Sequence, residues 1–419
     1  MFPEYFLFGT ATSSHQIEGD NIYNDWWDWE QKGKVRHKSG KACNHWELYR
    51  EDIELMAKLG FNAYRFSIEW SRIFPRKNEE NPDALERYKE IVRLLREKNI
   101  EPMVTLHHFT NPRWFIEEGG WLKKDNIRYF LDYVELVVNE LKDVDLWVTF
   151  NEPIVYVLMG YVWGKWPPGI KSMGKAGVVE VNIYRAHAEA VKIIREHGRK
   201  AGIVKNLVAF KPYSEKKRDM AAYKRAEHIY NWAFLDAMET GVLRLLRGVA
   251  KVPQVKIDFI GVNYYTGYIV KHSWNPFKMF MDTRPLDTGE WTTMGYCVYP
   301  KGLYEVLKKT HERYNKTIYV TENGVATEDD EFRIRAIIRH LQYLHKALNE
   351  GVDVKGYFYW SLLDNFEWAE GYTQKFGIVE VDFTTFERKP RRSAYIYGEI
   401  ARCKKISDEL LEKYGVKEN

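Results

Sequence analysis

Short apolar runs alternate with longer amphipathic segments along the whole chain of 419 residues. Eight of these runs are apolar at nearly every position, which is typical of strands that are covered on both faces. The predicted strands span residues 6–11, 62–70, 102–109, 146–151, 203–210, 257–265, 317–322 and 355–362.

Helical periods lie between these strands. In residues 83–98, apolar residues recur at steps of three and four and form one face of a helix. Residues 333–351 show the same pattern, with Gly351 as the expected cap. A shorter helix over residues 47–58 ends before Gly60 in the same way.

Eight strands that are each followed by a helix require parallel pairing through right-handed crossovers. The pattern therefore predicts the α/β class and a single (β/α)8 TIM barrel. No linker or sequence repeat separates a second domain, so we expect residues 1–419 to form one domain. The stretches near 266–300 and 363–392 are then insertions at the C-terminal rim of the barrel.

Composition narrows the classes of function without choosing one. The 63 basic and 59 acidic residues nearly balance, which gives no special attraction to nucleic acid. The three cysteines show neither metal-ligand spacing nor a disulfide framework, and we expect no metal and no cofactor. The N-terminus lacks a basic leader and no apolar run reaches membrane-spanning length, so we expect a cytoplasmic protein.

Aromatic residues make up 15% of the chain and include 15 tryptophans. Aromatic faces stack on the C–H faces of sugars, so this composition suits a carbohydrate site, while a large core accounts for most of these residues. Only five glutamines accompany many lysines and glutamates, a composition that favours a thermostable protein.

Two of the predicted strands end in a glutamate beside an asparagine. Glu152 follows the strand over 146–151, and Glu322 ends the strand over 317–322. Active sites of (β/α)8 barrels lie at the C-terminal ends of the strands, so we expect both side chains to face one cavity. Two carboxyl groups that flank a sugar can cleave a glycosidic bond, and retaining enzymes hold them about 5–5.5 Å apart.

Each glutamate also has a purely structural interpretation. Glu152 could lie in the first turn of a helix, with Pro153 as its first residue. Glu322 could be a turn residue before Asn323 and Gly324, a favoured turn dipeptide. These structural interpretations become less favourable when the two glutamates are considered together, because each of them ends a predicted barrel strand.

Seven motifs occur in register along the chain. They are FLFGTATSSHQIEG, YRFSIEWSRIFP, VTLHHFTNP, TFNEP, DFIGVNYYTG, VTENG and GYFYWSLLDNFEWAEGYTQKFGIVEVDF. Together they resemble glycoside hydrolase family one, the family of β-glucosidases and β-galactosidases. The resemblance implies a retaining β-glycosidase that hydrolyses terminal non-reducing β-D-glycosidic bonds by double displacement through a covalent glycosyl-enzyme. β-Glucosides and β-galactosides are the implied substrates, with transglycosylation as a second outcome.

The resemblance implies a role for each matched residue of the catalytic motifs. Glu322 is the nucleophile, and Glu152 is the acid and base. Arg65 is placed to keep Glu322 ionised, and the negative charge of Glu322 is expected to raise the pKa of Glu152. Asn151 resembles the residue that hydrogen-bonds the sugar 2-hydroxyl. Tyr265 resembles the tyrosine that contacts the nucleophile, and Asn263 lies on the same strand face.

The resemblance implies roles for the sugar-binding residues in the same way. Gln16 and Glu367 match residues that bind vicinal hydroxyls, and Trp368 matches the residue that covers a ring face. His108 matches the histidine of the third-strand motif, while His107 is expected to face the other side of that strand. Trp360 matches the stacking platform. Taken singly, His108 and Trp360 read as core residues, and their positions within the motifs reverse that interpretation.

Two positions bear on the substrate. The third-strand motif usually continues from histidine to tryptophan, but Phe109 stands here, which is expected to loosen the sugar site. The branch of the family that acts on 6-phosphorylated sugars carries a serine where Glu367 stands. A carboxylate would repel a phosphate, so Glu367 disfavours that branch.

Other classes of function fit the sequence less well. No HExxH motif or cysteine pair indicates a metal hydrolase, and no glycine-rich loop or serine-centred elbow is present. A sugar-binding protein without catalysis would lack one of the two carboxylates. A mainly synthetic enzyme would form the same glycosyl-enzyme and favour alcohols over water. The expected partners are small β-glycosides or short oligosaccharides, with the subunit number left open.

The apolar stretch WNPFKMFM, residues 274–281, is expected on the rim after the sixth strand. It could line a site for alkyl or aryl leaving groups, or touch a membrane surface or another subunit. The favoured alternative is a loop that simply packs onto the barrel.

Overall fold

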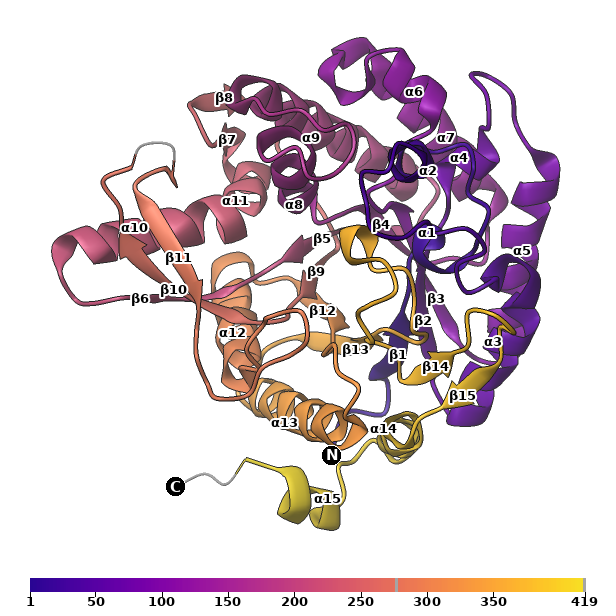
Figure 1. The fold of residues 1–419 in the computed structure, drawn as a ribbon, viewed down its shortest axis with the longest axis vertical. Coiled ribbons are helices and arrows are strands. Elements are labelled where there is room, and N and C mark those ends of the chain that lie inside the picture. The colour runs from indigo at the N-terminus through magenta and orange to yellow at the C-terminus, as the bar shows by residue number, and fades with distance from the viewer. Residues whose placement is uncertain (276–277, 417–419) are drawn as a thin grey trace.

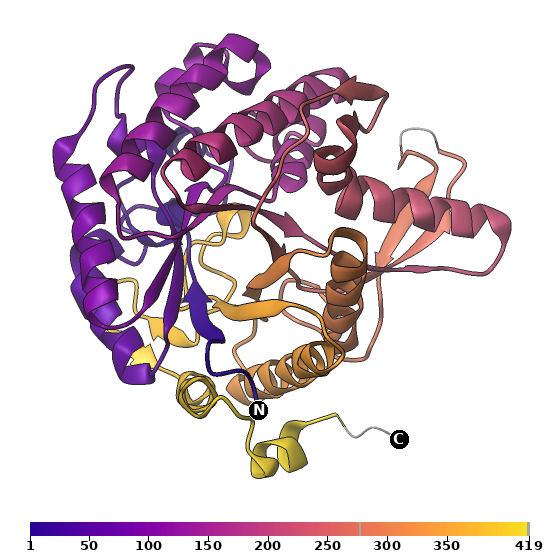
Figure 2. The same cartoon turned by 180° about the vertical axis from the view of Figure 1, so that it is seen from behind.

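A computed structural model describes residues 1–275 and 278–416. Eight parallel strands close into a barrel in the order β1–β2–β3–β4–β5–β9–β12–β13, with β13 paired to β1. Helices surround the strands when the barrel is seen from either end (Figure 1 and Figure 2). The barrel strands are β1 (Leu7–Ala11), β2 (Ala63–Ser67), β3 (Glu101–His107), β4 (Leu146–Asn151), β5 (Lys200–Asn206), β9 (Phe259–Asn263), β12 (Thr317–Asn323) and β13 (Val354–Trp360).

The outer layer consists mainly of amphipathic helices, and most of them are eleven residues or longer. They are α3 (His45–Leu59), α5 (Pro82–Glu97), α7 (Ile127–Glu140), α9 (Met173–Glu196), α10 (Lys217–Glu227), α11 (Ala233–Thr240), α12 (Pro300–Tyr314), α13 (Asp330–Asn349), α14 (Arg392–Cys403) and α15 (Asp408–Tyr414). Shorter helices are α1 (Ser14–Ile17), α2 (Asp25–Gln31), α4 (Trp70–Ile73), α6 (Arg113–Glu117) and α8 (Pro153–Val157). Residues 158–162 and 228–232 form π-helical turns, and residues 120–122, 124–126 and 368–370 form 3₁₀ turns.

The predicted helices are confirmed, and their ends have local causes. The predicted helix over 333–351 is α13, which begins earlier because the Asp329 side chain accepts hydrogen bonds from the first-turn amides. Gly351 follows its last turn with φ of +85°. Gly60 ends α3 with φ of +89°, a conformation that glycine adopts without strain.

All eight predicted strands form the barrel, but several end before their apolar run ends. The run over 62–70 continues past Ser67 because Ile68 and Trp70 are also buried, under the segments that cover the rim. The run over 203–210 divides in two. β5 ends at Asn206, and β6 (Ala209–Pro212) leaves the barrel, so the prediction of one strand there is wrong.

β6 belongs to a separate three-stranded sheet with β10 (Gly267–His272) and β11 (Met281–Pro285). With α10, this sheet forms an arm that projects from the side of the barrel (Figure 1). Two further pairs of short strands are β7 (Val242–Arg244) with β8 (Val249–Lys251), and β14 (Val379–Val381) with β15 (Arg388–Pro390).

The barrel interior has its own apolar cluster, distinct from the larger core between strands and helices. Each barrel strand contributes to it, because alternate residues of a strand face inward. Its members include Ala11, Ala63, Met103, Val148, Val204, Phe259, Tyr319 and Phe358. The barrel interior is therefore a packed core and not a channel. Among the described residues, no helix has the length and apolar character needed to cross a membrane.

Candidate active site

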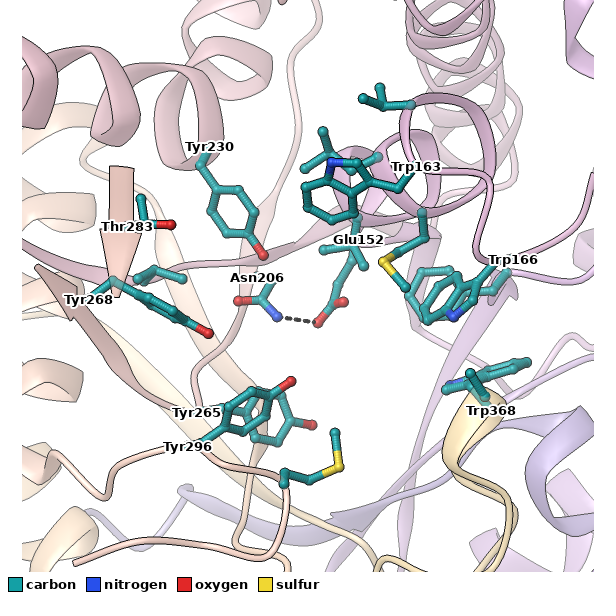
Figure 3. A pocket seen from close by; sticks show the side chains of 18 of the residues that line it. Glu152, Trp163, Trp166, Asn206, Tyr230, Tyr265, Tyr268, Thr283, Tyr296 and Trp368 are labelled. Atoms are coloured by element: carbon teal, nitrogen blue, oxygen red, sulfur yellow. Dashed lines mark hydrogen bonds between the residues drawn. The ribbon is translucent and has the colours of Figure 1, made fainter. Parts of the chain in front are cut away.

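A cavity of about 770 Å³ opens at the C-terminal ends of the barrel strands. Its walls combine strand ends, the loops that follow them and the inner face of the arm (Figure 3). Most of the predicted site residues line it: Gln16, His108, Asn151, Glu152, Tyr265, Glu322, Trp360, Glu367 and Trp368. The two remaining ones, Arg65 and Asn263, are fully buried next to the cavity and contact its lining residues.

The two glutamates reach the cavity by different backbone routes. Glu152 follows β4 with a left-handed φ of +46° and precedes α8, whose first residue is Pro153. The interpretation of Glu152 as a helix-start residue is thus correct for the backbone, but its side chain makes no cap hydrogen bond. Glu322 lies inside β12, so its interpretation as a turn residue is wrong. Both side chains are buried at the cavity.

A chain of hydrogen bonds joins the two carboxyl groups. Arg65 donates from Nη1 to Glu322 Oε1 at 2.6 Å and from Nη2 to Asn151 Oδ1 at 2.8 Å. Asn263 Nδ2 donates to the same Asn151 oxygen at 3.2 Å and to Glu152 Oε1 at 2.7 Å. Every link is a side chain of a barrel strand or of the residue that follows one, so the barrel itself sets the geometry.

Tyr265 and Asn206 complete the contacts of the glutamates. Tyr265 Oη donates to Glu322 Oε2 at 2.5 Å, so this carboxylate accepts hydrogen bonds on both oxygens. Asn206, the last residue of β5, donates from Nδ2 to Glu152 Oε1 at 3.1 Å (Figure 3). Asn206 is absent from the predicted site, although a polar residue inside an apolar run is the same signal that identified Glu322.

Burial raises the pKa of Glu152 to about 8, and the negative charge of Glu322 adds to this effect. Hydrogen bonds from Asn263 and Asn206 and the charge of Arg65 act in the opposite direction. The charge of Glu322 therefore contributes as predicted, but desolvation is the larger cause. At neutral pH the geometry presents one protonated carboxyl group beside another that is paired with arginine.

One wall of the cavity is a stack of flat rings. The His108 ring lies nearly parallel to Trp360, with centroids 6.0 Å apart, and to Trp368, with centroids 6.2 Å apart. Burial holds the pKa of His108 well below its usual value, and Arg65 and His107 add to the shift, so the ring is neutral. His107 faces the opposite side of the strand, as predicted, and hydrogen-bonds Asn111 at 3.0 Å.

Gln16 and Glu367 lie together at the foot of this wall. Gln16 Nε2 donates to Glu367 Oε2 at 3.2 Å and to the carbonyl oxygen of Phe366 at 2.9 Å. Burial raises the pKa of Glu367 to about 8, and the charge of Glu322 adds to the shift. Phe109 packs on Trp166, with ring centroids 4.9 Å apart, and on Trp368, at 5.4 Å, and brings no polar atom to this corner.

The outer part of the cavity was largely missed from the sequence. Tyr230, Tyr268 and Tyr296 line one side, with their hydroxyl groups toward the cavity, and Trp163 stands on the other (Figure 3). Within the described ranges, none of the three hydroxyl groups hydrogen-bonds to the chain. Of the tyrosines labelled in Figure 3, only Tyr265 lies within one of the seven sequence motifs. Tyr230 belongs to a π-helical turn, Tyr268 to the arm and Tyr296 to a loop.

Within the predicted rim stretch 274–281, the described residues 274–275 and 278–281 lie at the tip of the arm. Met279 and Met281 line the cavity, whereas Trp274 is 79% exposed. Residues 276 and 277 lie outside the described residues. The described residues of the stretch therefore include some that face the cavity and one, Trp274, that faces solvent.

Comparisons with known proteins agree with this site. The model of glycosyl hydrolase family 1 matches residues 1–406. A β-glycosidase from Pyrococcus horikoshii is 55% identical, with a TM-score of 0.97 and coverage of 100% of this chain and 98% of that chain. β-Glucosidase A from Thermotoga maritima is 38% identical over 97% of this chain and 99% of its own. A 6-phospho-β-galactosidase from Staphylococcus haemolyticus is 34% identical over 96% of this chain and 99% of its own. The chain therefore belongs to glycosyl hydrolase family 1, and it is an enzyme that hydrolyses O-glycosyl bonds.

Proposed function

We propose that the protein is a retaining β-glucosidase in which Glu322 is the nucleophile and Glu152 is the general acid and base. The observation that carries this assignment is the hydrogen-bonded chain from Glu322 through Arg65, Asn151 and Asn263 to Glu152. It joins the two carboxyl groups that line one cavity, as double displacement requires. Residues 1–419 act in this proposal as one catalytic domain.

In the first half of the reaction, Glu322 attacks the anomeric carbon and Glu152 protonates the departing oxygen. Arg65 and Tyr265 each donate a hydrogen bond to one oxygen of Glu322 and hold its carboxyl group in place. Glu152 is protonated at neutral pH because its pKa is raised to about 8, chiefly by burial. The bond to the leaving group breaks as the ester bond to Glu322 forms.

In the second half, Glu152 removes a proton from water, and the resulting oxygen attacks the same carbon. Glu322 is now an ester and carries no charge, so one cause of the raised pKa of Glu152 is gone. The pKa of Glu152 therefore falls when a base is needed. An alcohol in place of water would give transglycosylation.

The inner cavity fits an unphosphorylated sugar. Gln16 and Glu367 are placed to bind adjacent hydroxyl groups, and Trp360 and Trp368 offer ring faces. Relatives named β-glucosidase and 6-phospho-β-galactosidase have similar identities to this chain, so identity alone does not choose between them. Glu367 supports the unphosphorylated substrate, since a carboxyl group offers a phosphate no positive partner. β-Glucosides are the proposed substrates, with β-galactosides accepted as well.

The outer cavity fits the leaving group. Trp163 offers an aromatic face, and the hydroxyl groups of Tyr230, Tyr268 and Tyr296 offer hydrogen bonds, which suits short oligosaccharides. Met279 and Met281 add an adaptable apolar surface that alkyl and aryl groups can also occupy. Equal rates on short-chain and long-chain alkyl glucosides would remove the alkyl part of this proposal.

A panel of 4-nitrophenyl β-glycosides, with and without a 6-phosphate, tests the assignment on the wild type and on Glu322→Ala. We expect the variant to lose at least about 10⁴-fold in kcat, and azide to restore cleavage with an inverted glycosyl azide as product. Glu328→Ala is the matched control, because Glu328 is an exposed acid on the loop after β12. Near-normal hydrolysis by Glu322→Ala would show that Glu322 is not the nucleophile. Faster turnover of the 6-phosphorylated glycosides would show that Glu367 does not select unphosphorylated sugars.

A further inference from the structure

The acid/base residue receives two hydrogen bonds on one of its oxygens. Asn263, the last residue of β9, donates from Nδ2 to Glu152 Oε1 at 2.7 Å, and Asn206, the last residue of β5, donates to the same oxygen at 3.1 Å. Asn206 and Asn263 lie opposite each other where β5 pairs with β9. The backbone amide of Glu152 also donates to β5, at the carbonyl oxygen of Val204. Glu152 is thus held by the strand that ends in Asn206.

The direction of these hydrogen bonds follows from Arg65. A guanidinium group only donates, so the Asn151 atom that faces it is the carbonyl oxygen Oδ1. Asn263 approaches the same oxygen at 3.2 Å and must do so with its amino group. The Asn263 carbonyl oxygen then accepts a hydrogen bond of 2.7 Å from the Thr321 hydroxyl group. The group that Asn263 presents to Glu152 is therefore an N–H donor.

This direction determines which oxygen of Glu152 carries the proton. Burial raises the pKa of Glu152 to about 8, so the carboxyl group is protonated at neutral pH. The short hydrogen bond from Asn263 goes to the better acceptor of a protonated carboxyl group, which is its carbonyl oxygen, so Oε1 is unprotonated and the proton lies on Oε2. Asn206 can then face Oε1 only as a donor, and its amide oxygen points away from Glu152 (Figure 3).

Glu152 Oε2 is available to a ligand. Within residues 1–275 and 278–416, neither a side chain nor a backbone group hydrogen-bonds to this atom, and it is open to the cavity. In Figure 3 it lies on the side of the carboxyl group that is remote from Asn206. One oxygen of Glu152 is thus held by two amide groups, and the other is exposed to the leaving group of a substrate.

We propose that Asn206 is a positioning residue, which together with Asn263 holds Glu152 Oε1 as an acceptor and so directs the acid proton from Oε2 to the leaving oxygen. The inference rests on the proposed acid/base role of Glu152. A single hydrogen bond from Asn263 would leave the carboxyl group free to rotate about that contact. A second donor from the neighbouring strand fixes the plane of the carboxyl group, and general acid catalysis requires such placement.

The same arrangement serves both halves of the proposed reaction. In the first half, the proton on Oε2 passes to the leaving oxygen as that oxygen takes the electron pair of the breaking C–O bond, and Glu152 becomes a carboxylate. The hydrogen bonds from Asn206 and Asn263 lower the pKa of Glu152 and so favour this charged form. In the second half, Oε2 takes a proton from water while Oε1 keeps its two donors. The charges of Glu322 and Arg65 also act on Glu152, but the two amide groups are the ones that orient it.

Asn206→Leu tests the proposal, because leucine has nearly the shape of asparagine and cannot donate a hydrogen bond. The substrates are phenyl, 4-nitrophenyl and 2,4-dinitrophenyl β-glucosides, whose leaving groups depend less and less on protonation. We expect kcat/KM for the phenyl glucoside to fall about ten- to thirtyfold, and kcat/KM for the 2,4-dinitrophenyl glucoside to stay within about twofold of the wild type. Loss of the donor also raises the pKa of Glu152, so the alkaline limb of kcat/KM for the phenyl glucoside should move up by about 0.5 pH unit.

Asn139→Leu is the matched control. Asn139 is an exposed residue of α7 that donates to Glu140 at 3.2 Å, so the substitution removes the same kind of hydrogen bond at the surface. It is expected to leave the three rates and the alkaline limb unchanged. If Asn206→Leu does not fold, Asn206→Val is measured instead, since valine also lacks a donor and favours a strand.

Two results would overturn the role of Asn206. One is a fall in kcat/KM of the same size for all three glucosides, because a distorted site or a lost contact to the leaving group lowers the three rates alike. The other is a set of rates and an alkaline limb that match the wild type. Both results leave the role of Glu152 intact, because Glu152→Ala tests it separately. Normal hydrolysis of the phenyl glucoside by Glu152→Ala would instead overturn the proposed function itself.

Discussion

Arg65 Nη1 donates a hydrogen bond of 2.6 Å to Glu322 Oε1, between two side chains that are both buried. The same guanidinium also contacts Asn151, the residue before Glu152. One planar group thus fixes the distance between the ends of β12 and β4, and it does so with charge as well as geometry.

Replacement of Arg65 by methionine is expected to lower kcat/KM for a 4-nitrophenyl β-glucoside by about 10²–10³-fold, because Glu322 loses its cation and its orientation. Thermal unfolding should be followed alongside kinetics, since the variant also leaves a buried carboxylate without its partner. Arg50→Met, at a surface ion pair on α3, is the control. A kcat/KM within threefold of the wild type would show that Glu322 does not need Arg65.

The pH dependence of kcat/KM should have an alkaline limb near pH 8. In the proposed mechanism, the first half of the reaction requires protonated Glu152, whose pKa is raised to about 8, so the rate falls as the pH rises through that value. A 2,4-dinitrophenyl leaving group departs without protonation, and its kcat/KM should lack the limb. If both substrates show the alkaline limb of kcat/KM at the same pH, the limb reflects the ionisation of a residue other than Glu152.

Folding stability should also fall on the alkaline side. The pKa of Glu367 is raised to about 8 by burial and by Glu322, above its ordinary value of 4.5, so the folded state holds this proton more tightly than the unfolded state. The resulting stabilisation is complete below pH 4.5 and is lost as the pH rises through about 8. Glu367→Gln removes this ionisable group, so the variant lacks its contribution to the pH dependence of folding stability.

We therefore expect thermal unfolding temperatures between pH 6 and pH 9 to decline less in Glu367→Gln than in the wild type. Glu328→Gln, on an exposed loop, should decline as the wild type does. Parallel curves for all three proteins would mean that Glu367 is ionised throughout this range in the folded enzyme.

Trp163→Ala should weaken the binding of the leaving group and leave the binding of the glycone unchanged. Trp163 stands across the outer cavity from the tyrosine hydroxyl groups, and the loss of its face is expected to raise KM for a cello-oligosaccharide about five- to tenfold. Methyl β-glucoside has no leaving-group ring and serves as the control substrate. An equal change for both substrates would place Trp163 at the glycone.

Sequence patterns were sufficient for the barrel because its strands are buried on both faces and its helices on one, which gives each element a distinct period. They were also sufficient to bring Glu152 and Glu322 to the same cavity, since both follow from strand ends. The end of β5 was missed because Leu207 and Val208 continue the apolar run after the strand stops. Apolar residues indicate burial, and Leu207 and Val208 remain buried although the chain changes direction between β5 and β6.

The outer cavity escaped prediction for a related reason. Tyr230, Tyr268 and Trp163 come from a π-helical turn, from the arm and from the segment after α8, which only the three-dimensional structure brings together. An isolated tyrosine in such a segment has the same sequence context as any core tyrosine. The balance between burial and charge in the pKa of Glu152 likewise depends on packing around the residue, which no linear pattern records.

The division between β5 and β6 has a consequence for how this enzyme can change. Asn206 ends the strand that supports Glu152, and the arm begins with Ala209, so two residues separate the chemistry from a module that holds much of the outer cavity. Loops of another length or character could replace the arm without moving a single strand of the barrel. New acceptor preferences can therefore arise on a fixed reaction centre, by exchange of the two peripheral segments that form the arm on either side of β9.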